Sequence, residues 1–273
     1  MDFIEILKAI LFGIVEGITE WLPISSTGHM IILDELVKLN VSDAFREMFL
    51  VVIQLGAILA VVVLYFKKLW PFSTKEKFFI KKDTFGMWFK ILAACIPAAI
   101  VGVFFDDKIN ELFYNYQTVA AMLIIFGVLF IVIENYNKGR KPVINSIAEI
   151  TWKAAIGVGL FQLIAAVFPG TSRSGATILG GILLGMSRTT AAEFTFFLAV
   201  PVMAGASLLK LVKFGLAFSA SEAVILIVGM VVAFVVSIIV IKFLLNYIRR
   251  NDFKAFGWYR IVLGVLVILF FSL

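Results

Sequence analysis

Two short polar stretches interrupt an otherwise apolar chain of 273 residues, and both contain side chains suited to phosphate chemistry. Residues 21–29 read Trp-Leu-Pro-Ile-Ser-Ser-Thr-Gly-His, and residues 168–177 read Phe-Pro-Gly-Thr-Ser-Arg-Ser-Gly-Ala-Thr. At an offset of 146 residues the stretches align, with Ser26 opposite Ser172. Hydroxyl groups, a histidine and an arginine, with carboxylates just upstream, are the groups that bind and transfer a phosphoryl group. We therefore expect one phosphate site built from both stretches.

Two glutamates precede the first stretch. Glu16 and Glu20 are four residues apart, so they share one face of a helix. A carboxylate at the centre of a bilayer costs roughly 2.5–3.5 kcal/mol on the insertion scale, so both should face the protein interior. Two oxygen ligands on one face suit Mg²⁺ or Ca²⁺, which would also bridge phosphate oxygens. A pair solvated at the membrane surface and a pair sharing one proton are the alternatives.

The hydroxyl groups of the first stretch follow a proline at which a second helix should begin. Ser25, Ser26 and Thr27 are residues that cap helices, and the free N–H groups of a helix start attract an anion. Ser26 is the candidate nucleophile, because His29, three residues on, could take its proton. As the only histidine, His29 could instead act as general acid or as the nucleophile.

Arg173 is the cationic group of the second stretch. An arginine at membrane depth needs an anion, which is either a phosphate bound through two N–H groups or one of the two glutamates in an ion pair. The neighbouring hydroxyl groups are candidate phosphate donors: Ser172, Ser174 and Thr177. The stretch lacks the Lys-Ser/Thr ending of a Walker A loop, so nothing here indicates a nucleotide.

The composition is that of an all-α polytopic membrane protein. Hydrophobic residues make up 62% of the chain and charged residues 15%, against about 25% charged residues in soluble domains. Lys and Arg lie mainly between apolar runs, so the net charge of +6 does not indicate a nucleic-acid partner. The single cysteine excludes an intrachain disulfide. Six runs are long enough to span a bilayer: about 47–66, 87–105, 117–136, 190–212, 222–245 and 256–272.

Segments 2–38 and 147–186 have a different pattern, in which two short apolar halves flank a polar break. We expect each to form a re-entrant helical hairpin, which is tolerated at membrane depth only where it is buried or lines a wet cavity. Each half of the chain then has one hairpin and three spans. Because three is odd, the halves insert in opposite senses, which predicts an inverted-topology repeat within one membrane domain. Repeat 1 covers about 1–136 and repeat 2 about 147–273.

The charges of the loops predict the orientation. The connections at 67–90, 138–153 and 246–255 are rich in Lys and Arg, and all three fall on one side of a six-span chain. Basic loops stay in the cytoplasm, so both termini should lie outside. The first hairpin would enter from outside and the second from the cytoplasm, with their tips meeting near the midplane.

The residues at 13–29 and 169–177 together resemble the bacterial undecaprenyl-diphosphatase family, which is linked to bacitracin resistance. The resemblance covers essentially the whole chain. It implies an enzyme of the bacterial plasma membrane that removes the terminal phosphate of the lipid undecaprenyl diphosphate, recycling the carrier for cell-wall synthesis. It also implies a divalent cation and a site open to the outer face. The catalytic positions that match its motifs are Glu16, Glu20, Ser26, His29 and Arg173.

Several alternatives stay open at this point. The nucleophile is either Ser26 or a metal-bound water. Broken helices in inverted repeats are also typical of transporters, so a flippase of a lipid phosphate is the second class of function. A transporter needs neither a base nor a nucleophile, which favours the enzyme. The sequence is compatible with a homo-oligomer but does not specify one.

Overall fold

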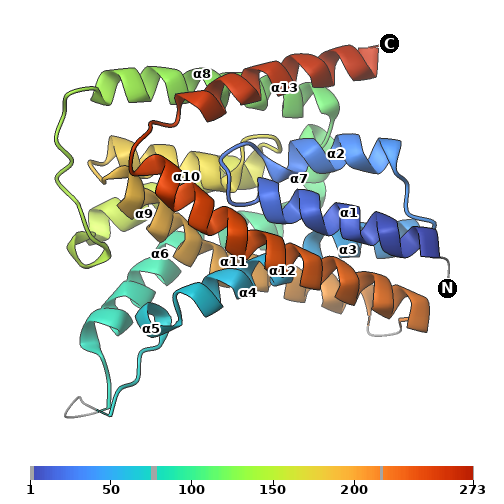
Figure 1. Cartoon of the computed structure of the whole chain (residues 1–273), viewed down its shortest axis with the longest axis horizontal. Helices are drawn as coiled ribbons and strands as arrows, with labels where there is room; N and C mark the ends of the chain where they lie inside the picture. Colours follow the sequence, from blue (N-terminus) through green and yellow to red (C-terminus); the bar gives the residue numbers. More distant parts are fainter. Residues whose placement is uncertain (1–2, 75–78, 216–217, 273) are drawn as a thin grey trace.

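The computed structural model describes residues 3–74, 79–215 and 218–272. Lys75 and Lys77 of the basic 67–90 connection lie outside these ranges. Within them every regular element is helical (Figure 1). Six helical stretches are long and apolar enough to cross a membrane, which confirms the six predicted spans: Asp43–Leu64, Lys82–Phe104, Tyr116–Asn137, Arg188–Phe214, Ala220–Ile248 and Lys254–Ser272.

The first span consists of α3 (Asp43–Val52) and α4 (Gln54–Leu64), which meet at Ile53, and the other five are α6, α8, α11, α12 and α13 in the order just given. Polar caps set several of the starts. Ser219 and Glu222 form a reciprocal capping box at the start of α12. Short elements connect the spans: α5 (Phe66–Leu69), α7 (Asp106–Phe113) and a 3₁₀ turn (Ile147–Glu149).

Four shorter helices occupy the two segments predicted as hairpins. α1 (Phe3–Thr19) and α2 (Ser26–Leu36) flank the first polar stretch, and α9 (Trp152–Val167) and α10 (Arg173–Leu183) flank the second. In Figure 1 α1 starts at the end of the molecule that holds the N-terminus, and α2 runs back to that end. Each polar stretch is therefore the loop, here called a tip, between two short helices.

The shorter helices are held by close backbone packing against spans. α1 runs along α12, and α9 runs along α6. A Cβ at Gly13 would lie 2.6 Å from the carbonyl oxygen of Gly229 in α12, and one at Gly159 would lie 2.4 Å from that of Ala94 in α6. Only glycine permits these approaches, and small residues at helix contacts are typical of membrane bundles. α8 and α13 form a further packed pair.

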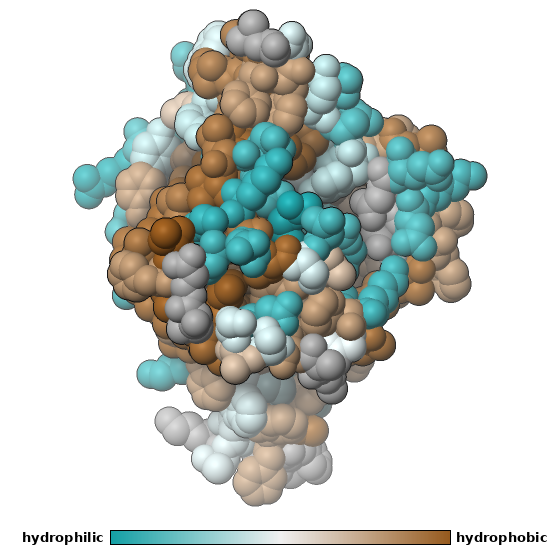
Figure 2. Space-filling view, turned by 90° about the vertical axis from the view of Figure 1, so that its right-hand side faces the viewer, coloured by the Kyte–Doolittle hydropathy of each residue, from teal (hydrophilic) through white to brown (hydrophobic). Residues whose placement is uncertain are grey.

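Both termini lie at the same end of the molecule (Figure 1). Figure 2 views that end and shows hydrophilic residues gathered among hydrophobic ones. Ion pairs occur at these helix ends, with Lys8 2.7 Å from Glu5 and Lys38 3.1 Å from Glu35. In Figure 1 the helix ends that flank the three basic connections lie on the left of the molecule, away from both termini.

Candidate active site

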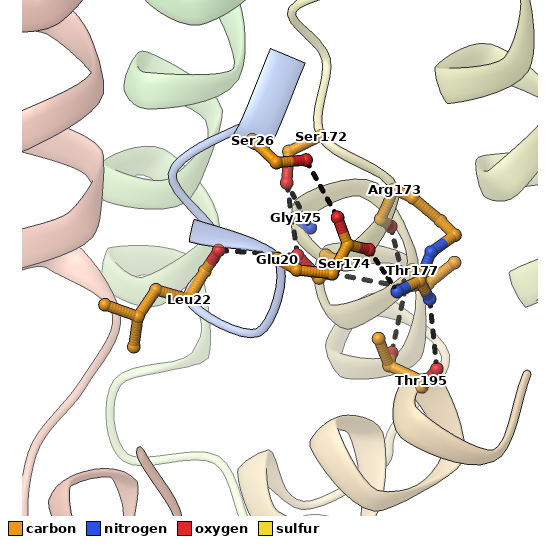
Figure 3. Close-up of polar contacts among 9 residues, drawn as sticks. All are labelled: Glu20, Leu22, Ser26, Ser172, Arg173, Ser174, Gly175, Thr177 and Thr195. Carbon is orange, nitrogen blue, oxygen red and sulfur yellow. Dashed lines mark hydrogen bonds and ion pairs between the residues drawn. The ribbon is translucent and has the colours of Figure 1, made fainter. Parts of the chain in front are cut away.

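The two tips meet in a buried polar network (Figure 3). Arg173 Nη2 donates to Glu20 Oε1 at 2.7 Å, and Ser26 Oγ donates to Glu20 Oε2 at 2.8 Å. The side chains of Arg173 and Glu20 are only 13% and 7% exposed. Three predicted site residues from two distant stretches are therefore joined through one carboxylate, and in this structure the anion beside Arg173 is Glu20.

The two loops have the same local conformation just before α2 and α10. Ser25 and Ser172 are the N-caps, both with positive φ values, of 75° and 69°. Their hydroxyl oxygens accept from the N–H groups of Gly28 (3.4 Å) and Gly175 (3.2 Å). The local equivalence is therefore Ser25 with Ser172, an offset of 147, which corrects the offset of 146 expected at this point.

The one-residue shift has a chemical consequence. Ser26 and Arg173 are the first residues of α2 and α10, so they occupy equivalent places at two helix starts.

Gly170, with φ of +89°, lies in the second loop, and a Cβ there would lie 2.5 Å from the carbonyl oxygen of Val119. The conformation and the tight contact both require glycine at this position.

The hydroxyl groups predicted to bind phosphate differ in their contacts and in their burial. Ser174 Oγ lies 3.2 Å from Ser172 Oγ and 3.4 Å from the carbonyl oxygen of Leu22, which ties the second tip to the first. Ser172 is half-buried, as is Thr27 in the first turn of α2. These hydroxyl groups line the two helix starts from which Ser26 and Arg173 project.

Thr177 is fully buried and supports Arg173 through backbone contacts. Its hydroxyl donates to the carbonyl oxygen of Arg173 at 2.8 Å and accepts from Thr195 Oγ1 at 2.8 Å. Arg173 Nη1 in turn donates to the carbonyl oxygen of Thr195 at 3.2 Å. α11 therefore contributes Thr195 to the network, and no pattern in the sequence indicated this residue.

Glu16 lies fully buried with no hydrogen-bond partner for either carboxylate oxygen among the described residues. Gln162, its counterpart at the offset of 146, is equally buried and unpartnered. Buried oxygens of this kind are normally satisfied by water, a proton or an ion. In the described part of the chain no group of three or more His, Cys, Asp or Glu residues forms a metal cage. A cation here would take Glu16 and Glu20 as its protein carboxylates.

His29 has partners at both ring nitrogens. Nδ1 lies 2.7 Å from the carbonyl oxygen of Ser25, and Nε2 lies 2.7 Å from the hydroxyl of Tyr259. The ring planes of His29 and Tyr259 are nearly parallel, 7° apart, with centroids 5.7 Å apart. Ser26, which the sequence paired with His29, instead has Glu20 as its hydrogen-bond acceptor.

Sequence reasoning missed two neighbours on α13. Tyr259 contacts His29, and Arg260 is fully buried between the tips. An arginine inside the predicted 256–272 span was a usable signal, because ionisable residues within spans mark functional sites. For Tyr259 the sequence offered no such signal, since tyrosines are common at membrane surfaces.

Comparison with known proteins identifies the family to which the chain belongs. The family model described as bacitracin resistance protein BacA matches residues 9–266. The chain belongs to this family. It is 68% identical to the undecaprenyl-diphosphatase of Desulfitobacterium hafniense, covering 100% of this chain and 98% of that protein. It is 67% identical to undecaprenyl-diphosphatase 1 of Clostridium acetobutylicum, covering 99% of both, and 60% identical to an undecaprenyl-diphosphatase of Enterococcus faecalis, covering 98% of both.

Proposed function

We propose that this membrane protein hydrolyses undecaprenyl diphosphate to undecaprenyl phosphate and inorganic phosphate in the bacterial plasma membrane. Relatives that match the chain from end to end carry the name of this activity. The observation that carries the proposal is the convergence of Ser26, Glu20 and Arg173 in one buried network. These are a hydroxyl nucleophile, a base and a phosphate-binding cation.

The hydrogen bonds give Ser26 and Glu20 their roles in the first step. Ser26 Oγ attacks the terminal phosphorus while its proton passes to Glu20, which already accepts that hydrogen bond at 2.8 Å. A bond from Oγ to phosphorus forms and the anhydride P–O bond breaks. The electron pair leaves with undecaprenyl phosphate.

In the second step water attacks the phosphoserine and the Oγ–P bond breaks; one hydrogen of the water passes to Ser26 Oγ and its hydroxyl stays on the phosphorus. Glu20 passes the proton that it took from Ser26 to the departing phosphate. The products are inorganic phosphate and the free enzyme, so atoms and charge balance over both steps.

Arg173 stabilises the charge of the phosphoryl group as it transfers. Its guanidinium has five N–H donors, and Glu20 and the carbonyl of Thr195 engage two of its nitrogens. The remaining donors are available to phosphoryl oxygens, which arginine binds in pairs. The free N–H groups at the starts of α2 and α10 add donors of the same polarity.

A divalent cation, Mg²⁺ or Ca²⁺, fits beside this network, with Glu16 and Glu20 as its protein ligands. The support is the buried Glu16 carboxylate, whose two oxygens accept no hydrogen bond from any described residue. When bound, the cation would neutralise the charge of the diphosphate. Glu16 also needs such a partner to remain ionised at full burial, because an unpaired buried charge is unstable.

The fold supports an inverted repeat of two re-entrant hairpins and six spans. In such a repeat α1 corresponds to α9, and α12 corresponds to α6. The contact of α1 with α12 is therefore matched by the contact of α9 with α6. The matching caps at Ser25 and Ser172 point to the same relation. With the basic connections in the cytoplasm, both termini face outward and the first tip opens toward the outer face.

The test is to look for the covalent intermediate in purified protein in detergent. Undecaprenyl diphosphate is added, the reaction is quenched with acid, and Ser26 is examined by mass spectrometry for added phosphate. Phosphate release together with phosphorylated Ser26 is expected. Steady release with Ser26 never modified, even in a rapid quench, would reject the serine mechanism. No release from folded protein supplied with cation and lipid, with flux of lipid phosphate through liposomes, would instead identify a transporter.

A further inference from the structure

Arg260 is a buried cation whose partners in the described part of the chain are neutral. Its side chain is fully buried in α13, and no ion pair to an acidic residue is found for it there. The guanidinium lies over the ring of Phe126 at 5.8 Å and donates only to backbone carbonyl groups. Burying a charge without a charged partner is among the costliest arrangements in a protein. We therefore expect the contacts of Arg260 with these carbonyl groups to fix a part of the structure that function requires.

The carbonyl groups belong to both tips. Nη1 donates to Pro23 at 3.3 Å, in the first loop. Nη2 donates to Gly170 at 2.9 Å and Thr171 at 2.8 Å, in the second loop, and to Met122 of α8 at 3.3 Å. One planar group therefore joins two loops that are separated by about half of the sequence. Lysine, with a single nitrogen, cannot reproduce this fork.

The joined loops are those that place the reacting groups. Pro23 precedes the cap Ser25 by two residues, and Thr171 directly precedes the cap Ser172. Ser26 and Arg173 follow those caps and meet at Glu20. A change in the spacing of the loops would therefore change the distance between nucleophile and phosphate-binding cation.

Tyr259, the residue before Arg260 in α13, contacts His29. The carbonyl of Ser25 can only accept, so Nδ1 of His29 carries a hydrogen, and in the neutral ring Nε2 accepts from the Tyr259 hydroxyl. The Tyr259 hydroxyl therefore fixes the ring plane and occupies the ring nitrogen that carries no hydrogen. Tyr259 is 46% exposed, so its contact with His29 lies at the surface of the protein.

We propose that Tyr259 and Arg260 are a positioning pair, in which Arg260 sets the spacing of the two tips and Tyr259 orients His29. Neither needs to touch the reacting phosphorus. The proposal rests on the phosphatase function proposed above. It makes α13, which lies outside both motifs, part of the site.

The test compares Arg260→Lys with Arg188→Lys in phosphate release from undecaprenyl diphosphate. Arg188 is a matched control, because it also joins helices through its guanidinium but pairs with Glu134 rather than with either tip. For Arg260→Lys we expect kcat per folded molecule to fall about tenfold to a hundredfold, with KM within about threefold, since a small misplacement costs this much. Arg188→Lys should lower thermal stability and keep kcat.

The outcomes separate the two proposals. An inactive wild-type protein would reject the phosphatase function itself. An active wild type with Arg260→Lys at full kcat would overturn the positioning role alone, and so would a change confined to KM.

If Arg260→Lys does not fold, Tyr259→Phe tests the pair through its other member, since it removes one hydroxyl and keeps the ring. We expect kcat to fall about tenfold, close to the contribution of one hydrogen bond, and the pH profile of kcat to move. Wild-type kcat with an unchanged pH profile would overturn the proposal.

Discussion

Replacing Glu20 by glutamine tests the network at its centre. Glutamine has the same shape as glutamate but no charge, and its side chain has one acceptor oxygen rather than two. In the structure Ser26 and Arg173 each donate to a different oxygen of Glu20. In Glu20→Gln one of these two donors must face the amide NH₂, so the base and the ion pair cannot both be kept.

The magnitudes follow from burial. Arg173 is 13% exposed and Glu20 is 7% exposed, and removing one partner of a buried pair costs about 3–5 kcal/mol. Arg173 keeps its bond to the Thr195 carbonyl, so we expect a loss of about 3 kcal/mol in the free energy of unfolding. Loss of a general base lowers kcat by roughly 10²- to 10⁴-fold.

The assay is phosphate release from undecaprenyl diphosphate, corrected for the folded fraction by size-exclusion chromatography and thermal melting. Glu193→Gln is the control. Glu193 pairs with Lys68 at 3.0 Å, but the Lys68 side chain is 56% exposed, so this loss should cost less than about 1 kcal/mol and leave kcat unchanged. A Glu20→Gln protein that keeps more than about a tenth of wild-type kcat would refute the assignment of Glu20 as base.

Two further predictions concern packing and the cation. A Cβ at Gly56 would lie 2.0 Å from the carbonyl oxygen of Met230, whereas one at Gly205 meets nothing within 4 Å. Gly56→Ala should therefore destabilise the protein by about 2 kcal/mol or more in thermal or denaturant unfolding. Gly205→Ala should be neutral or stabilising by about 1 kcal/mol. Equal effects of the two variants would contradict the tight contact between α4 and α12. EDTA should abolish turnover and Mg²⁺ or Ca²⁺ restore it, with Glu16→Gln weakening metal binding about tenfold or more in titration calorimetry; turnover indifferent to EDTA would exclude the cation site.

The membrane architecture could be predicted because its signal is local. Each span is a continuous apolar run, and the six runs match six helical stretches. The polar breaks were equally readable, since Pro, Gly and Ser interrupt helices wherever they cluster. That Glu20, Ser26 and Arg173 would share one site followed from chemistry, because each needs a polar partner inside an apolar protein.

The missing parts depend on tertiary contacts. Arg260 binds backbone carbonyl groups, which every residue has, so its partners leave no pattern in the sequence. For a similar reason the sequence did not indicate the hydrogen-bond acceptor of Ser26 in the structure. Sequence spacing favoured His29, but the loop turns the Ser26 hydroxyl toward Glu20, and Tyr259 from a distant helix engages the histidine.

The most direct test of the central claim, that both halves build one phosphatase site, is a double-mutant cycle on Ser26→Ala and Arg173→Ala. Phosphate release from undecaprenyl diphosphate is measured for the wild type, both single variants and the double variant. Residues that act on the same phosphoryl group are not additive, so each single variant should lose at least about a hundredfold in kcat, and the double variant should be no slower than the slower single variant. A single variant with wild-type turnover, or losses that multiply in the double variant, would contradict a shared site.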